Sequence, residues 1–137
     1  MSGTIGRAIQ IVSPTEADYG GSSFWFGSDF TATAGTTTAH DVRIDKTCLL
    51  FSGSFCAEGA AIGDLISFSV VDVDGIVAPA GTVLSEYVDD LRVVDGERRR
   101  LQSGQTAELV SGVYLRVTYA SSGASDVRVL LDWQVFR

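Results

Sequence analysis

The sequence predicts an all-β fold, a single-domain antiparallel β-sandwich of the jelly-roll type, and three observations lead to this prediction. Turn signals recur about every ten residues, and the 137 residues include 15 glycines but only two prolines. The runs between these turns are rich in β-branched and aromatic residues. Only Thr82–Leu91 has helical spacing, and because it also fits an alternating strand we expect a strand there. Many short strands with almost no helix favour a sandwich over α/β architectures.

The end of the chain has the clearest strand pattern. Residues 112–137 contain two β-prone runs that flank the short loop Ser121–Ser125, and we expect them to form a β-hairpin. Alternate residues of a strand share a face, so each run has one apolar face. The expected core residues are Val113, Leu115, Val117 and Tyr119 in the first run, and Val127, Val129, Leu131, Trp133 and Val135 in the second. The chain is therefore expected to end in its core.

The first thirty residues allow more than one interpretation. A short strand is expected at Ala8–Val12, and turn and loop signals follow from Ser13 to Ser23. Within a single domain spanning residues 1–137, residues 1–30 are either an ordered strand region or an extended arm that becomes ordered on assembly.

Three consecutive aromatic residues, Phe24, Trp25 and Phe26, follow this region. They cannot all point inward from one strand, because neighbouring side chains face opposite sides. Either a local loop covers them or they form an interface with another subunit, where tryptophan is enriched. These three residues are the only predicted interaction site.

The middle of the chain alternates between strand and turn signals. Phe30–Ala39 is rich in threonine and alanine, which predicts an extended arm or an edge strand. Asp41–Phe51 predicts two strands, or one bulged strand, with a break at Asp45-Lys46. Asp64–Val73 predicts a strand that the turn Asp74-Gly75 closes.

The chain has two cysteines, Cys48 and Cys56. In one extended strand their sulfur atoms share a face and lie roughly 26 Å apart at about 3.3 Å per residue, which is beyond disulfide reach. Only a hairpin that turns near Ser52-Gly53 would bring them together. We interpret both as buried thiols, since free cysteine behaves as a small hydrophobic residue.

Charge and hydropathy exclude several classes of partner. The net charge of −7 argues against nucleic acid, whose phosphates require a basic surface. The only basic run, Arg98–Arg100, follows Asp95-Gly96-Glu97 and is interpreted as a solvated turn, the alternative being a contact to phosphate or an acidic partner. No apolar run approaches the roughly 18 residues of a membrane span, and the first residues lack the apolar core of a signal peptide. These features predict a soluble protein made in the cytoplasm.

The sequence contains no signature of a reaction. His40 is the only histidine, and its neighbour Asp41 would point to the opposite face of a strand, so the two do not form a catalytic acid–orienter pair. No flanking motif supports a nucleophilic pair between His40 and either cysteine. There is also no phosphate-binding loop, dinucleotide fingerprint or zinc spacing. We therefore predict no enzyme, no catalytic residue, no cofactor and no metal.

Two acidic groups are candidate ligand sites. Asp72-Val73-Asp74-Gly75 resembles the opening of a calcium loop, but Ile76–Pro79 supplies no further side-chain oxygen and the closing glutamate is absent, so a strand-ending turn is favoured. Glu86, Asp89 and Asp90 form either a paired-carboxylate site, if they line a cleft, or a solvated edge, which is the favoured interpretation.

Three segments are similar to small β-sandwich proteins of tailed bacteriophage virions. They are Gly63–Asp72, then Gly112–Tyr119 with Ser121-Ser122-Gly123, then Val127-Arg128-Val129 leading into an apolar C-terminus. Together they cover roughly half of the chain, and the motifs are structural.

This resemblance implies a non-enzymatic virion structural protein. Members of the class decorate or cement capsids, or build adaptors and fibres, usually as homo-oligomers. The implied partners are the major capsid protein or another virion protein, with no nucleic acid and no membrane, and the implied location is the virion after synthesis in the host cytoplasm. No binding residue carries over, because the likeness lies in packing residues. The alternative is a tail-associated receptor- or glycan-binding module in which Trp25 stacks on sugar rings.

Overall fold

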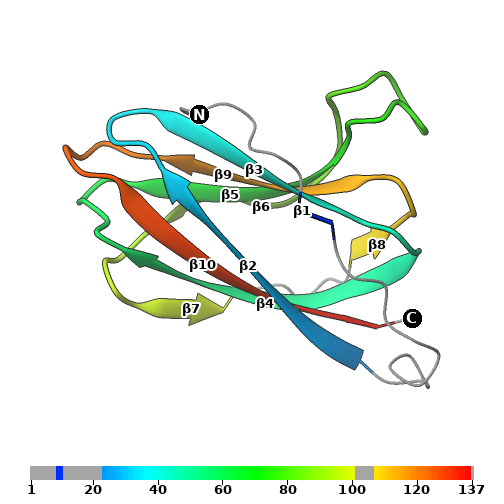
Figure 1. The fold of residues 1–137 in the computed structure, drawn as a ribbon, viewed down its shortest axis with the longest axis horizontal. Helices are drawn as coiled ribbons and strands as arrows, with labels where there is room; N and C mark the ends of the chain where they lie inside the picture. The colour runs from blue at the N-terminus through cyan, green and yellow to red at the C-terminus, as the bar shows by residue number, and fades with distance from the viewer. Residues whose placement is uncertain (1–8, 11–22, 101–106, 137) are drawn as a thin grey trace.

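The computed structural model describes residues 9–10, 23–100 and 107–136, and these ranges contain ten strands and no helix (Figure 1). The strands are β1 (Ile9–Gln10), β2 (Ser23–Ala32), β3 (Thr37–Arg43), β4 (Cys48–Glu58), β5 (Leu65–Asp72), β6 (Thr82–Arg92), β7 (Arg98–Arg100), β8 (Ala107–Leu109), β9 (Tyr114–Ala120) and β10 (Val127–Phe136).

The strands form two sheets that pack face to face. The first, which we call the β9 sheet, has the order β1-β3-β9-β5-β6, and the second, the β10 sheet, has the order β2-β10-β4-β7 with β8 also beside β4. Every strand pair is antiparallel except β1 with β3. The predicted all-β, antiparallel sandwich architecture is confirmed.

The core lies between the inner faces of the two sheets. All nine residues predicted from the terminal runs are buried, each at most 2 % exposed. Trp133 of β10 meets Phe68 of β5 edge to face across the sandwich, with ring centroids 5.5 Å apart. Phe68 also contacts Phe55 of β4 at 5.9 Å. These aromatic contacts join the two sheets at their centre.

The predicted terminal hairpin is wrong, although both strands exist. β9 pairs with β3 and β5, whereas β10 pairs with β2 and β4 in the other sheet. The loop 121–126 therefore crosses from one sheet to the other. A hairpin would have placed both apolar faces on the same side of one sheet. In the observed arrangement each face covers the other, which removes both from water.

Two further predictions need correction. Phe30–Ala39 is not one strand, because β2 ends at Ala32 and a turn follows in which the Thr36 amide donates to the Thr33 carbonyl (3.3 Å). Arg98–Arg100 is not a turn but the short strand β7, which pairs with residues 54–56 of β4. The turn lies just before it.

Other predictions agree with the structure. Asp41–Phe51 belongs to two strands with a break at Asp45-Lys46, Asp64–Val73 contains β5, and Thr82–Leu91 lies within β6. Of residues 1–30, the structure describes β1, which occupies part of Ala8–Val12, and the start of β2. The expected loop from Ser13 lies outside the described residues as far as Ser22.

The two cysteines lie in one continuous strand but not on one face. The register of β10 with β4 shifts so that Gln134 pairs with Ser52 and Val135 with Leu50, which leaves one extra residue in β4. This β-bulge inverts the alternation of side chains. Cys48 is consequently buried in the core, whereas Cys56 is partly exposed, and both are free thiols. Buried thiols were predicted at both positions, so the prediction is confirmed only for Cys48.

Asp64, just before β5, organises the loops at one end of the sandwich. Its carboxylate is fully buried and accepts hydrogen bonds from the Tyr119 hydroxyl (2.6 Å), the Ala61 amide (3.0 Å), and the amide (2.7 Å) and hydroxyl (2.8 Å) of Ser122. Burial alone raises the pKa of Asp64, but these hydrogen bonds outweigh burial, so its pKa lies below the usual value. The loops before β5 and after β9 are thus fixed to each other.

We expect Tyr119→Phe to lower the free energy of unfolding by about 1–3 kcal/mol, because it removes one donor from a buried carboxylate. Urea denaturation at neutral pH measures this change. The matched control is Tyr114→Phe, whose hydroxyl bonds Asp74 near the surface (3.3 Å), and it should cost less than about 1 kcal/mol. Equal losses in both variants would contradict the role assigned to Asp64.

Candidate functional site

The loop between β5 and β6 projects from one end of the sandwich, at the upper right of Figure 1. Asp72, the last residue of β5, is fully buried. Its carboxylate accepts hydrogen bonds from the backbone amides of Ile76 (2.8 Å), Val77 and Ala78 (2.5 Å). The carbonyl of Asp72 accepts the amide of Gly81 (2.6 Å). One residue therefore fixes both sides of the loop.

These contacts confirm the strand-ending turn at Asp72–Gly75. Burial alone raises the pKa of Asp72. The hydrogen bonds from the amides of Ala78, Val77 and Ile76 together outweigh burial, so the pKa of the carboxyl group lies below its usual value. Its oxygen atoms point at N–H groups and do not converge on a cation position. The resemblance to a calcium loop is therefore superficial.

A second set of contacts anchors the base of the loop. Arg43 of β3 forms an ion pair with Asp74 (2.7 Å) and donates to the hydroxyl of Tyr114 in β9 (3.2 Å), and that hydroxyl donates to Asp74. The hydrogen bond with Tyr114 and the charge of Asp74 raise the pKa of Arg43. The loop is thus tied to β3 and β9 as well as to β5.

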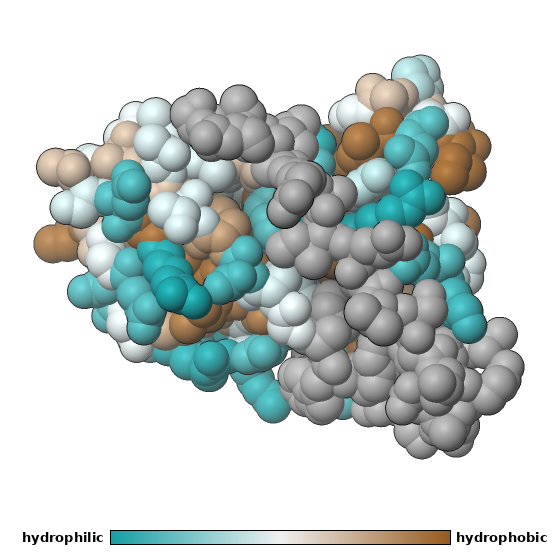
Figure 2. Space-filling view, in the orientation of Figure 1, coloured by the Kyte–Doolittle hydropathy of each residue, from teal (hydrophilic) through white to brown (hydrophobic). Residues whose placement is uncertain are grey.

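The outer surface of this loop and the start of β6 is apolar. Four side chains are exposed there, and we call them the tip patch: Ile76 (57 % exposed), Val77 (59 %), Val83 (50 %) and Leu84 (37 %). Residues 75–85 include no charged side chain. Figure 2 shows the apolar surface gathered on the projecting loop. Exposed apolar patches on otherwise polar proteins mark contact surfaces.

The tip patch is not among the sites predicted from the sequence. The signal was present, because the uncharged run Ile76–Ala80 directly follows the Asp74-Gly75 turn. An apolar run in a turn is ordinarily assigned to a buried strand. Only the structure shows that Asp72 turns the backbone N–H groups inward and leaves these side chains outside.

His40 and Asp41 lie on opposite faces of β3, as predicted. The His40 ring faces inward and stacks on Phe30 of β2, with centroids 4.7 Å apart and planes 9° from parallel. Asp41 faces outward and is only 1 % exposed, and it accepts a bidentate pair of hydrogen bonds from Arg116 of β9 (2.8 and 3.0 Å). Both residues therefore have structural contacts, and neither orients the other.

The predicted acidic cluster lies along the exposed strand β6. Asp89 and Asp90 both accept from the hydroxyl of Ser67 (3.3 and 3.4 Å), while Glu86 pairs in register with Ser69. All three acidic side chains are exposed. Their exposure supports the favoured interpretation of a solvated edge.

Ion pairs neutralise much of the charge on the outer face of the β10 sheet. Arg98 of β7 pairs with Asp132 of β10 (2.6 Å), and Arg128 of β10 pairs with Asp29 of β2 (2.9 Å). Arg99 lies 3.7 Å from Glu97. Arg98 and Arg99 therefore each lie beside a carboxylate, in a strand and not in the predicted turn.

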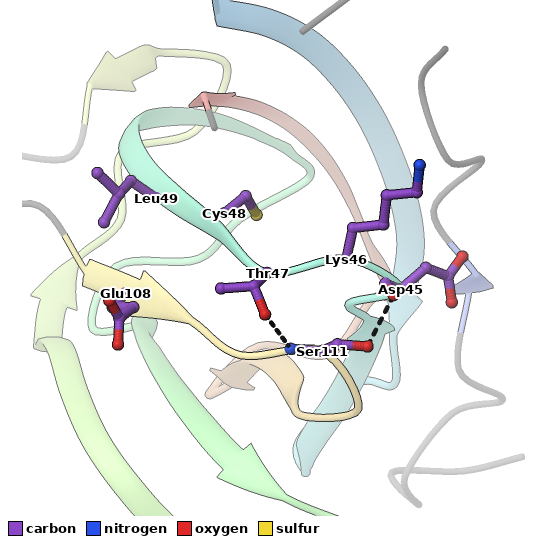
Figure 3. Close-up of a pocket in the computed structure, with 7 residues that line it drawn as sticks. All are labelled: Asp45, Lys46, Thr47, Cys48, Leu49, Glu108 and Ser111. Carbon is purple, nitrogen blue, oxygen red and sulfur yellow. Dashed lines mark hydrogen bonds between the residues drawn. The ribbon is translucent and has the colours of Figure 1, made fainter. Parts of the chain in front are cut away.

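An open pocket of about 690 Å³ lies beside the start of β4 (Figure 3). The Ser111 amide donates to the Thr47 hydroxyl (3.1 Å) and the Ser111 hydroxyl donates to the Asp45 carbonyl (2.7 Å), so two loops form one wall. Burial raises the pKa of the Cys48 thiol to about 11, which keeps it protonated and a poor nucleophile. The lining residues are Asp45, Lys46, Thr47, Cys48, Leu49, Glu108 and Ser111.

The predicted interface residues Phe24, Trp25 and Phe26 have their backbone in β2, where they pair in register with Val135, Gln134 and Trp133 of β10. Their side chains lie outside what the structure describes.

No group of three or more His, Cys, Asp or Glu side chains in the described part of the chain is placed to hold a metal ion, and no helix in that part is long and apolar enough to span a membrane. No protein-family model, curated protein or solved structure matches this chain.

His40 makes the stability of the fold depend on pH. Burial lowers its pKa below the usual value, although the charges of Asp41 and Asp29 act in the opposite direction. Its Nε2 makes no hydrogen bond within the described residues. The unfolded chain therefore binds a proton more readily than the folded protein, and the folded state loses stability as the pH falls below the unfolded pKa of about 6.5.

We expect this loss to disappear in His40→Phe, which keeps a ring beside Phe30. Urea denaturation of both proteins from about pH 8 to about pH 5 gives the difference in their free energies of unfolding. That difference should be constant above about pH 7 and change below it, with the native protein weakened more. A difference that is constant over the whole range would show that His40 does not titrate differently in the two states.

Proposed function

We propose that this chain is a non-enzymatic structural protein of a bacteriophage virion that decorates or cements the capsid through protein–protein contacts. The observation that carries the proposal is the order of the strands. The resemblance of residues 63–72 and 112–129 to small virion proteins points in the same direction.

The strand pairs are nested in the manner of a jelly roll. β5 pairs with β6, β4 with β7 and β8, β3 with β9, and β2 with β10, so the chain behaves as one long antiparallel hairpin folded over on itself. The two sheets then have the orders β2-β10-β4-β7 and β3-β9-β5-β6, with β1 added at one edge. This order supports a jelly-roll assignment, a fold of viral capsid proteins, lectins and cupins.

The chemistry of the described residues favours the first of these three classes. Cupin enzymes need a cluster of metal ligands in the barrel, whereas the only histidine here stacks on Phe30 in the core. The buried carboxylates of Asp41, Asp64 and Asp72 are saturated by donors from the fold itself. What the surface offers is a projecting apolar tip and broad faces crossed by ion pairs, which suit protein–protein contacts.

The proposal predicts that the chain is a stoichiometric part of the particle. Phage particles should be purified on a density gradient from the host that carries this gene, washed at moderate salt and quantified by mass spectrometry against the major capsid protein. We expect a fixed ratio of the two proteins. Particles from a deletion strain should release DNA at a lower temperature, and purified chain added back should restore the wild-type temperature.

Absence of the chain from washed particles, with recovery only from the soluble lysate, would overturn the proposal. A particle that contains the chain but has unchanged thermal stability after deletion would exclude the cementing role and retain a decorating one.

The jelly-roll order also occurs in lectins, which supports a glycan-binding module as the second candidate. This candidate predicts binding on a glycan array that Trp25→Ala abolishes, because stacking on a sugar ring needs the exposed aromatic face. An array without binding, or binding that Trp25→Ala leaves unchanged, would exclude it.

A further inference from the structure

We propose that His40 is a pH-sensitive switch between the two sheets, and that its protonation releases the edge strand β2 while the rest of the sandwich stays folded. This local opening differs from a loss of global stability, because only the outermost strand of one sheet separates. The proposal does not depend on the proposed function, since it concerns the isolated chain.

One ring contact joins β2 to the opposite sheet. His40 of β3 is 4 % exposed, and its ring stacks on Phe30 of β2 with centroids 4.7 Å apart and planes 9° from parallel. β2 is the outermost strand of the β10 sheet, and β10 is its only neighbour in that sheet among the described strands. A strand with one neighbour can separate at a lower free energy than the whole fold. β2 is therefore the segment that responds first when the stack is lost.

Two buried polar atoms, one on β2 and one on its stacking partner, have no hydrogen-bond partner within the described residues. They are Oγ of Ser28, which lies two residues before Phe30 on the same face of β2, and Nε2 of His40. Buried polar atoms without partners are costly. Both atoms gain hydrogen bonds from water when β2 moves away, so the closed position of this strand already carries a cost.

No charged side chain of β2, β3, β9 or β10 faces His40 from the core. Asp41 pairs with Arg116 on the outer face of the β9 sheet, and Asp29 pairs with Arg128 on the outer face of the β10 sheet. An imidazolium ion at His40 is therefore buried without a counter-ion, which is costly. Burial lowers the pKa of His40, although the charges of Asp41 and Asp29 act in the opposite direction. Protonation consequently favours the open form, in which the ring lies in water.

Hydrogen exchange of the full chain at about pH 7.5 and about pH 5.5, corrected for the pH dependence of intrinsic exchange, tests the proposal. The β2 amides should lose protection roughly tenfold between these values, the factor expected when the open form binds a proton with a pKa of about 6.5 and the closed form does not. At both values they should be less protected than the amides of β5 and β9. Low concentrations of urea should leave their exchange unchanged, because local opening exposes little surface. In His40→Phe, the change with pH should fall below about twofold.

Equal protection of β2 at the two pH values, or a loss that persists in His40→Phe, would overturn the proposal. Amides of β2 that are as strongly protected as those of β5 would also overturn it, because both strands would then exchange only when the whole protein unfolds. That last outcome leaves the pH dependence of global stability intact. Circular dichroism verifies that the variant is folded, and if His40→Phe is unfolded, His40→Gln replaces it.

Discussion

The burial of one inner sheet face against the other is the constraint on which the remaining structure depends. The Trp133–Phe68 contact at 5.5 Å lies at the centre of this interface, and residues from both sheets complete a core with almost no exposed surface. Strands β9 and β10 each have an apolar face, and by lying in opposite sheets they cover each other's apolar face. The chain must then cross between the layers repeatedly, and each crossing leaves backbone N–H groups in a loop that needs acceptors.

Two buried carboxylates on either side of β5 meet much of this need. Asp64 precedes the strand and Asp72 ends it, both are fully buried, and each receives several hydrogen bonds from the loop beside it. A buried carboxylate is costly unless donors surround it, so each loop is stable only in the conformation that presents its N–H groups to the carboxylate. The pKa values of Asp64 and Asp72 are both lowered in the folded protein. The stability that these ionised carboxylates contribute is therefore present above the unfolded pKa of about 3.9, and it is lost as the pH falls through their lower pKa values in the folded state.

Local patterns predicted the strands well, because alternation depends only on neighbouring residues. They could not predict partners, which depend on contacts between distant segments, and this is why β9 and β10 were expected to form a hairpin. Single-residue irregularities were also invisible. The extra residue of β4 near Ser52 puts Cys48 and Cys56 on different faces, and no local sequence signal predicts this β-bulge. At the candidate site, the apolar run that begins at Ile76 is visible in the sequence. Its exposure is not, because it follows from the hydrogen bonds that Asp72 accepts from the loop.

The loops at both ends of the sandwich are held by carboxylates and also expose apolar side chains. At the end opposite the tip patch, Asp64 binds Ser122 and Asp95 binds the amide of Gly59 (2.8 Å), while Ile62 (98 % exposed) and Val94 (47 %) lie at the surface. The ion-paired outer face of the β10 sheet offers a further surface for the contacts of the proposed capsid role. Such contacts are directional and sensitive to salt, which suits a component that is added to a surface already assembled.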